Sequence, residues 1–221
     1  VPYEDMPELE RFILHRLQDL DKMIRQSAEK YDFHTVFIAL HNFCGLELSS
    51  LYFDIRKDSL YCDKKDASKR RAARTVLFDT FSCLTAWLAP IICFTAEEAW
   101  QSRHTADWDD GPESVHLRQF PDVPRAWEDQ KLDKKWQRIR EIRRVVTGAI
   151  EVERASKKIG SSLQAAVKIF LTHSDTKLFE NLDVAEICIT SGAALTTDAI
   201  PVDAFSLDDV SNVGVQVIAA P

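Results

Sequence analysis

Residues 68–91 read SKRRAARTVLFDTFSCLTAWLAPI, and this stretch indicates the fold of the first half of the chain. Its apolar residues recur at three- and four-residue steps, which is the period of one helix face; they are Ala73, Val76, Leu77, Phe81, Leu84, Trp87, Leu88 and Ile91. Pro90 must end or kink this helix, because proline lacks the amide proton and clashes with the preceding turn. We therefore predict a long helix that begins at about Ser68.

Two further helices are predicted before this one. The first carries an apolar stripe at helical spacing, formed by Leu9, Phe12, Ile13, Leu17, Leu20, Ile24 and Ala28. Asp32 is a plausible N-cap for the second, which keeps its period past Gly45 to about Phe53. The following residues 54–68, DIRKDSLYCDKKDAS, lose the period and are predicted to form a loop.

After Pro90 the pattern predicts a new helix, a loop and a last long helix. Thr95-Ala96-Glu97-Glu98 has the form of a capping box, in which Thr95 and Glu98 each satisfy a free amide at a helix start. Residues 104–125 are rich in Asp, Gly and Pro and indicate a loop. A helix is expected over about 130–157, with Gly160 as its stop.

Beyond Gly160 the period changes to that of strands. Residues 165–171 alternate in polarity, and residues 184–190 and 213–219 are rich in β-branched side chains. A short helix is expected over 175–182. The fold class is therefore mainly α, with a small mixed α/β part at the end.

Two domains follow from this reading. Residues 1–125 are expected to be a helical bundle, and residues 126–221 a long helix that leads into a small mixed α/β subdomain.

Composition limits the class of protein. The 221 residues are 45% hydrophobic and 29% charged, as in an ordinary soluble globular protein. No apolar run reaches the ~20 residues that span a bilayer, so no membrane association is expected. The acidic start VPYEDMPELE is unlike a signal peptide, and a chain that begins at Val1 without Met is expected to be a segment of a longer protein.

The five cysteines give no sign of a metal site or of a disulfide framework. They are an odd number, are scattered, and form no Cys-x-x-Cys pair. We expect buried free thiols in a reducing cytoplasm and no bound metal.

Charge is unevenly distributed along the chain. The net charge is −7, yet residues 56–74 carry eight Lys and Arg against three acids, and residues 131–158 carry ten against four. Two basic strips on an acidic body suit a polyanion held at a defined place. The alternative is that both strips are solvated helix faces.

No independent catalytic centre is expected. The six histidines occur singly, and the chain has no HExxH, no GxSxG and no phosphate-binding glycine loop. Glu97 and Glu98 are adjacent carboxylates, but the capping box explains them better, since neighbouring helical residues do not face each other.

Several strings resemble a known family. Residues 48–63 (LSSLYFDIRKDSLYCD), 70–81 (RRAARTVLFDTF) and 87–100 (WLAPIICFTAEEAW) resemble the helical anticodon-binding domain of isoleucyl-tRNA synthetases. Residues 114–121 (SVHLRQFP) resemble the segment that closes that domain. Residues 139–167, which include ERASKKIGSSLQA, are similar to the family's connection into its C-terminal junction.

The resemblance implies a tRNA-recognition domain of a class I aminoacyl-tRNA ligase, one that attaches isoleucine to its tRNA in an ATP-dependent reaction. Motifs like HIGH and KMSKS are absent, so the segment is expected to lack catalytic residues and cofactors of its own. The parent enzyme is expected to use ATP and Mg²⁺, and a zinc-binding unit beyond Pro221 is left open. The implied partner is tRNA, without DNA or membrane, for a cytoplasmic monomer.

Two alternatives remain open at this point. One is the same domain of a valyl-, leucyl- or methionyl-tRNA synthetase, because the string at 87–100 is shared with those enzymes. The other is a helical protein-interaction module without an RNA role.

By the resemblance, the expected tRNA-binding residues gather in the two basic strips. They are Arg56, Lys57, Lys64, Lys65, Lys69, Arg70, Arg71 and Arg74 in the first, and Arg140, Arg143, Arg144, Lys157 and Lys158 in the second. Phe53, Tyr61 and Trp108 could stack on bases or pack internally. Arg56 and Lys57 could instead cap a helix end or pair with Asp54 and Asp58.

Overall fold

The chain divides into two compact units, Val1–Asp129 and Gln130–Pro221, in a computed structural model that describes residues 1–103 and 112–219. The division expected from the sequence, between residues 125 and 126, lies four residues before this boundary. The first unit is helical, and the second holds a long helix with a small sheet, so the mainly α class is confirmed.

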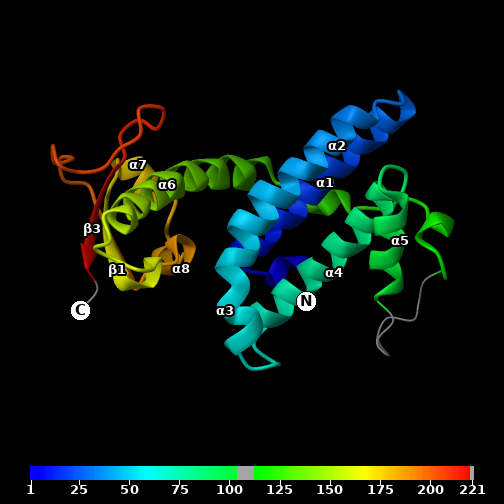
Figure 1. The fold of residues 1–221 in the computed structure, drawn as a ribbon, viewed down its shortest axis with the longest axis horizontal. Helices are drawn as coiled ribbons and strands as arrows, with labels where there is room; N and C mark the ends of the chain where they lie inside the picture. Colours follow the sequence, from blue (N-terminus) through cyan, green and yellow to red (C-terminus); the bar gives the residue numbers. More distant parts are fainter. Residues whose placement is uncertain (104–111, 220–221) are drawn as a thin grey trace. The chain divides into compact units, whose positions relative to one another are not determined.

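The first unit is a bundle of helices joined by short turns (Figure 1). Its elements are α1 (Glu8–Glu29), α2 (Phe33–Asn42), a π-helical segment (Phe43–Phe53), α3 (Asp54–Cys62), α4 (Ser68–Leu88), α5 (Cys93–Gln101) and short 3₁₀ turns at Tyr3–Asp5, Val115–Leu117 and Arg125–Trp127. The segments from α2 to α3 form one continuous helix over Phe33–Cys62.

The core of this bundle lies along α1. This helix contacts α2 and α4, and its apolar stripe is buried from Leu9 to Ile24, as the period predicts, with Ala28 half-buried. Trp87 of α4 and Tyr52 of the π-helical segment are also among the most deeply buried side chains. Burying a large apolar side chain stabilises a fold by about 1.5–3 kcal/mol, so these contacts fix the positions of the helix ends.

The expected loop over 54–68 is wrong in most of its length. The helix that contains Phe53 continues to Cys62, and the connection to α4 is only residues 63–67. The apolar period was lost in the sequence because a buried charged residue, Arg56, occupies a core position. The Asp32 cap is confirmed, since its carboxylate accepts from the Thr35 amide at 3.1 Å.

The capping box predicted at Thr95 is wrong. α5 begins at Cys93 after Ile92, so Thr95 lies inside the first turn. Glu97 instead accepts hydrogen bonds from Ser114 Oγ at 2.9 Å and from the Val115 amide at 2.8 Å. The carboxylate therefore ties the segment after residue 111 to α5.

The continuous helix Phe33–Cys62 is long and apolar enough to cross a membrane by length and composition, with a mean hydropathy of 1.3 in its most apolar window. A core helix of a packed bundle meets the same criterion. Here Glu47 pairs with Arg16, and Arg56 pairs with Glu10, both on α1. Buried charges that are paired within the bundle fit a core helix of a packed bundle rather than a membrane-crossing helix.

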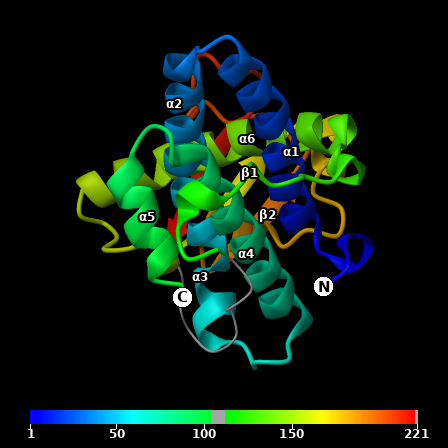
Figure 2. The ribbon, with the colours of Figure 1, turned by 90° about the vertical axis from the view of Figure 1, so that its right-hand side faces the viewer.

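The second unit begins with α6 (Gln130–Ala155) and continues through a 3₁₀ turn (Ser162–Gln164), β1 (Ala165–Phe170), α7 (His173–Lys177), α8 (Val184–Cys188), β2 (Gly192–Thr196) and β3 (Gly214–Ala219). β1 is the central strand, parallel to β2 and antiparallel to β3 (Figures 1 and 2). α6 contacts β1, β3 and α8. Gly148 permits a close approach in this unit, because an added Cβ would lie 2.8 Å from the Phe205 ring.

Two further expectations for the second unit are corrected. Residues 184–190 are not a strand: Asp183 caps α8 by accepting from the Glu186 amide at 3.0 Å, and β2 follows at Gly192. α6 ends before Gly160, since Lys157 adopts a left-handed conformation with φ of 59°. The long helix, β1 and β3 lie close to their expected positions.

Candidate nucleic-acid interface

The short connection between α3 and α4 forms one end of the first unit (Figure 1). The Ala67 amide donates to the Lys64 carbonyl at 3.0 Å, which makes a tight turn. The half-buried guanidinium of Arg70 donates to the Asp63 carbonyl and holds the turn against α4. The turn therefore has a defined backbone shape.

Five exposed cations surround this turn, and we call them the hairpin cations: Lys57, Lys64, Lys65, Arg71 and Arg74. Within the described parts of the chain, none of these five takes part in an ion pair. Lys69 and Arg70 lie in the same region but are half-buried. The first basic strip thus presents open positive charge at one end of the bundle.

The hairpin cation Arg71 lies with Lys69 and Arg70 at the start of α4, where positive charge is unfavourable for the helix itself. Its first turn holds Lys69, Arg70 and Arg71 with no acidic residue, and Ala67 provides no side-chain cap. The helix macrodipole places partial positive charge at this end, where a cation costs about 0.3–1 kcal/mol. Arg70 offsets this cost through its hydrogen bond to the Asp63 carbonyl, whereas exposed Arg71 forms no ion pair with the described residues, and a bound anion would stabilise its charge.

Arg56 does not belong to the open set, and the prediction that it faces RNA is wrong. Its side chain is 5% exposed and makes two contacts to Glu10, with Nε–Oε1 at 2.6 Å and Nη2–Oε2 at 2.8 Å. Tyr52 donates to the same carboxylate at 3.2 Å, and burial followed by the Glu10 charge raises the pKa of this phenol. This cluster holds α1 to the long helix.

Two aromatic side chains accompany the hairpin cations. Tyr61 is 82% exposed and Phe53 is 39% exposed. Trp108, the third aromatic considered from the sequence, lies outside the described residues. Aromatic faces next to cations are the groups that hold unpaired bases in RNA-binding proteins.

Most cations of the second basic strip are occupied. Arg143 donates to the Ile187 carbonyl at 2.8 Å, Arg144 pairs with Asp209 at 2.6 Å, and Lys158 pairs with Glu153 at 2.9 Å. Arg140 is half-buried. These residues stabilise the second unit, so the structure does not support an open RNA-binding face made of all five.

The exception is Lys157, which is exposed at the end of α6. It lines a surface pocket of about 540 Å³ together with Arg154, Lys158 and Gly160. Arg154, which we had not singled out in the sequence, pairs there with Glu151 at 2.6 Å. A run of cations after a helix end was the available signal for this pocket.

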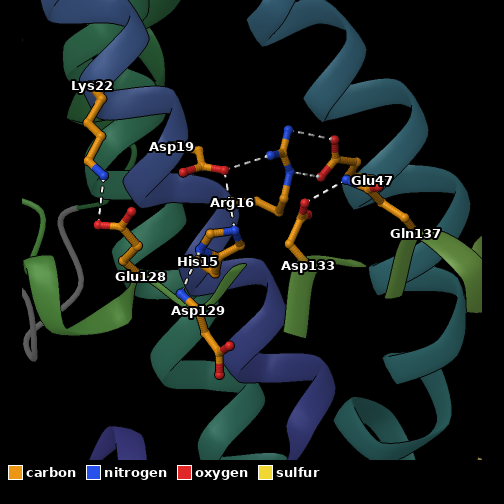
Figure 3. A network of polar contacts seen from close by, with 9 residues as sticks. All are labelled: His15, Arg16, Asp19, Lys22, Glu47, Glu128, Asp129, Asp133 and Gln137. Atoms are coloured by element: carbon orange, nitrogen blue, oxygen red, sulfur yellow. Dashed lines mark hydrogen bonds and ion pairs between the residues drawn. The ribbon is translucent and has the colours of Figure 1, made fainter. Parts of the chain in front are cut away.

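A polar network on α1 has a structural rather than a catalytic arrangement (Figure 3). Arg16 donates to Glu47 at 2.9 Å and to Asp19 at 3.1 Å. His15 is fully buried, with Nε2 at 3.3 Å from Asp19 and Nδ1 accepting from the Asp129 amide at 3.1 Å. The His15 ring is therefore a packed histidine, whereas His41, on α2, is exposed.

The thiols are more varied than expected. Cys83 and Cys188 are buried, and burial raises the pKa of each to about 12. Cys62 and Cys93 are exposed, so the expectation of buried thiols is wrong for them. In residues 1–103 and 112–219, no three His, Cys, Asp or Glu side chains are grouped closely enough to hold a metal ion.

Comparison with known proteins shows to which family the chain belongs. A family model described as the anticodon-binding domain of tRNA ligase matches residues 10–169. The chain is similar to the isoleucine–tRNA ligases of Agrobacterium fabrum (48% identical over 217 residues, 98% of this chain and 22% of the relative), Bartonella henselae (47% over 218, 97% and 22%) and Mesorhizobium japonicum (46% over 218, 98% and 22%). It spans about a fifth of the length of these curated relatives.

Proposed function

Because the chain belongs to the anticodon-binding domain family of tRNA ligases, we propose that it recognises the anticodon region of tRNA for an isoleucine–tRNA ligase. The hairpin cations are the proposed phosphate contacts. They are open, they gather at one end of the first unit, and one of them, Arg71, stands in the first turn of α4, where the helix macrodipole disfavours a cation. The gathering of five open cations at one place carries the proposal, because a bound polyanion would supply the counter-charges that the described residues do not.

The chemistry of aminoacylation is assigned to other parts of the ligase. We propose that the parent enzyme binds ATP and Mg²⁺ outside residues 1–221 and acts as a cytoplasmic monomer. The segment contributes affinity and choice of tRNA, since unpaired bases can be read by aromatic and cationic side chains while Lys and Arg neutralise phosphates. The pure segment should therefore show no ATP–pyrophosphate exchange with any amino acid.

The test is a filter-binding titration of tRNA against salt concentration. We expect the variant Lys64→Gln, Lys65→Gln, Arg71→Gln to bind more weakly and to lower the slope of log affinity against log salt by about 2, at about 0.7 for each phosphate on a single strand. Lys30→Gln, Arg125→Gln, Lys177→Gln is the matched control, since these residues are also exposed and the charge change is equal.

The outcomes separate the proposal from its alternatives. Salt-sensitive binding that only the first variant loses supports the hairpin cations. Equal loss from both variants would mean a diffuse charge effect and would contradict the proposed interface. No binding to tRNA at low salt would favour a protein-interaction module, and indifference to an exchanged isoleucine anticodon would contradict the assignment to isoleucine.

A further inference from the structure

The outward face of the helix from Phe53 through α3 carries two aromatic rings and one cation in a single line. Phe53, Lys57 and Tyr61 follow one another at four-residue steps, and we call them the α3 stripe. Residues four apart in an α-helix lie on the same face. The opposite face holds Ile55, Arg56 and Ser59, which are all buried, so the stripe points away from the core.

The spacing of the stripe is fixed by the helix. Each four-residue step advances about 6 Å along the axis, so Lys57 lies midway between two rings that are about 12 Å apart. The π-helical segment ends at Phe53, and the regular α-helical spacing begins there. Phe53 also lies 6.0 Å from the ring of buried Tyr52, which restricts its motion.

An exposed aromatic residue alone means little, because much of any protein surface is apolar. The same long helix provides a comparison at its other end. Tyr31, which precedes the helix, and Phe33 and Phe37 are exposed there as well, but Lys30 is the one Lys or Arg in residues 26–55. At the α3 end three cations, Lys57, Lys64 and Lys65, lie within four residues of Tyr61, and Lys57 stands between two exposed rings on one helix face.

We propose that Phe53 and Tyr61 are stacking platforms for two unpaired bases of the tRNA, and that Lys57 holds the phosphate between them. This proposal rests on the proposed function and adds the residues that contact bases. Aromatic rings stack on any base, and a cation between them binds the backbone. An apolar partner protein would fit the rings, but it would leave Lys57 without a counter-charge.

The test uses the 221-residue chain and an anticodon stem–loop RNA with 2-aminopurine in its loop, whose fluorescence falls when the base stacks. We expect Tyr61→Ala to weaken binding roughly tenfold, the effect of one lost base–aromatic stack, and to abolish part of the fluorescence change. Tyr61→Trp should retain both. A fully paired RNA hairpin of equal length should bind parent and Tyr61→Ala alike.

Tyr31→Ala is the matched control, because Tyr31 and Tyr61 are 83% and 82% exposed. It should bind the stem–loop as the parent does, and circular dichroism should show both variants folded. If Tyr61→Ala binds and quenches like the parent while the triple Lys64, Lys65 and Arg71 variant loses binding, the stacking proposal is overturned and the proposed function stands. If neither variant changes binding, both are overturned.

Discussion

The two basic strips look alike in sequence and differ in structure. Residues 56–74 carry a surplus of five positive charges and residues 131–158 a surplus of six. In the first strip the hairpin cations are exposed and form no ion pair with the described residues. In the second, arginines of α6 bind carboxylates and carbonyls of the same unit. A surplus of positive charge in a sequence segment therefore describes its composition and does not show whether the cations are free to bind a ligand.

Sequence distance explains why the second strip is occupied. Arg138 reaches Asp175, and Arg144 reaches Asp209, partners that folding of the second unit brings to α6. A count over a local window cannot include such acids. The first strip has acids close by in the chain, but its cations extend from a helix end and a turn, where the fold supplies few partners.

The largest expected effect separates the neighbours Arg56 and Lys57. Arg56→Ala leaves the fully buried Glu10 without its cation, and breaking a buried pair costs about 3–5 kcal/mol. Lys57→Ala removes an exposed charge and should change the free energy of unfolding by less than about 0.5 kcal/mol. Urea unfolding followed by circular dichroism measures both.

A double change tests the reason for that loss. Arg56→Met with Glu10→Leu replaces the pair by apolar groups, and such replacements are often neutral or stabilising. We expect it to recover part of the stability lost in Arg56→Ala, because the buried Tyr52 hydroxyl then lacks its acceptor on Glu10. If Arg56→Ala unfolds no more easily than Lys57→Ala, the buried pair is not present in solution, and Arg56 returns to the RNA-facing set.

The Arg138–Asp175 pair of the second strip should give the next largest effect. The hydrogen bond from Arg138 lowers the pKa of Asp175, and their carboxylate–guanidinium contacts are 2.8 and 3.1 Å. Because the side chains are only 23% and 12% exposed, we expect Arg138→Ala to cost about 1–2 kcal/mol, between surface and buried pairs.

The pH dependence of that loss has a definite sign. A folded-state pKa below the ordinary value of 3.8 for an aspartate contributes stability that is present above about pH 4 and disappears as pH falls through the folded value. The difference between parent and Arg138→Ala should therefore be constant from pH 7 to 5 and shrink below pH 4. A difference that stays constant down to pH 2 would contradict an ionic contribution.

Matched pairs of arginines test the two strips directly for RNA binding. Arg71→Gln with Arg74→Gln should bind tRNA several-fold more weakly and lower the salt slope by about 1.4, or roughly 0.7 for each phosphate. Arg144→Gln with Arg154→Gln removes two exposed arginines that already have carboxylate partners, and the tRNA affinity should change less than twofold. If the Arg144 and Arg154 variant weakens tRNA binding more than the Arg71 and Arg74 variant, the first strip is not the main RNA-binding face.

Much of the fold was predictable because its signals are local. The periodic stripes identified α1, α4 and α6, and the position of Asp32 identified a cap. The failure at 184–190 was also local, since Asp183 followed three residues later by Glu186 has the form of a capping box, which we did not single out in the sequence. The predicted helix boundaries were wrong where a turn or a buried charged residue interrupted the apolar period.

The candidate site was predictable as a region but not residue by residue. The strings around 48–81 led to the end of the bundle where the open cations gather, yet Arg56 and Lys57 are adjacent and have opposite environments. Which of two neighbouring cations turns inward depends on Glu10, which is 46 residues from Arg56. Such a pairing requires the packed structure, so the distinction between core and surface could not come from sequence.

The smallest expected effect concerns Lys157, the exposed cation that ends α6. Its amide and that of Lys158 donate to the carbonyls of Arg154 and Glu153 at 2.9 and 3.1 Å, a helix end that favours glycine at the left-handed position. Lys157→Gly should raise the free energy of unfolding by about 0.5–1 kcal/mol, because glycine adopts this conformation without a Cβ clash. The same change should weaken tRNA binding about twofold if the ammonium meets a phosphate, and Lys157→Asn should weaken it equally. A gain in stability with unchanged affinity would remove the second strip from the RNA interface, whereas no gain would show that the left-handed conformation does not persist in solution.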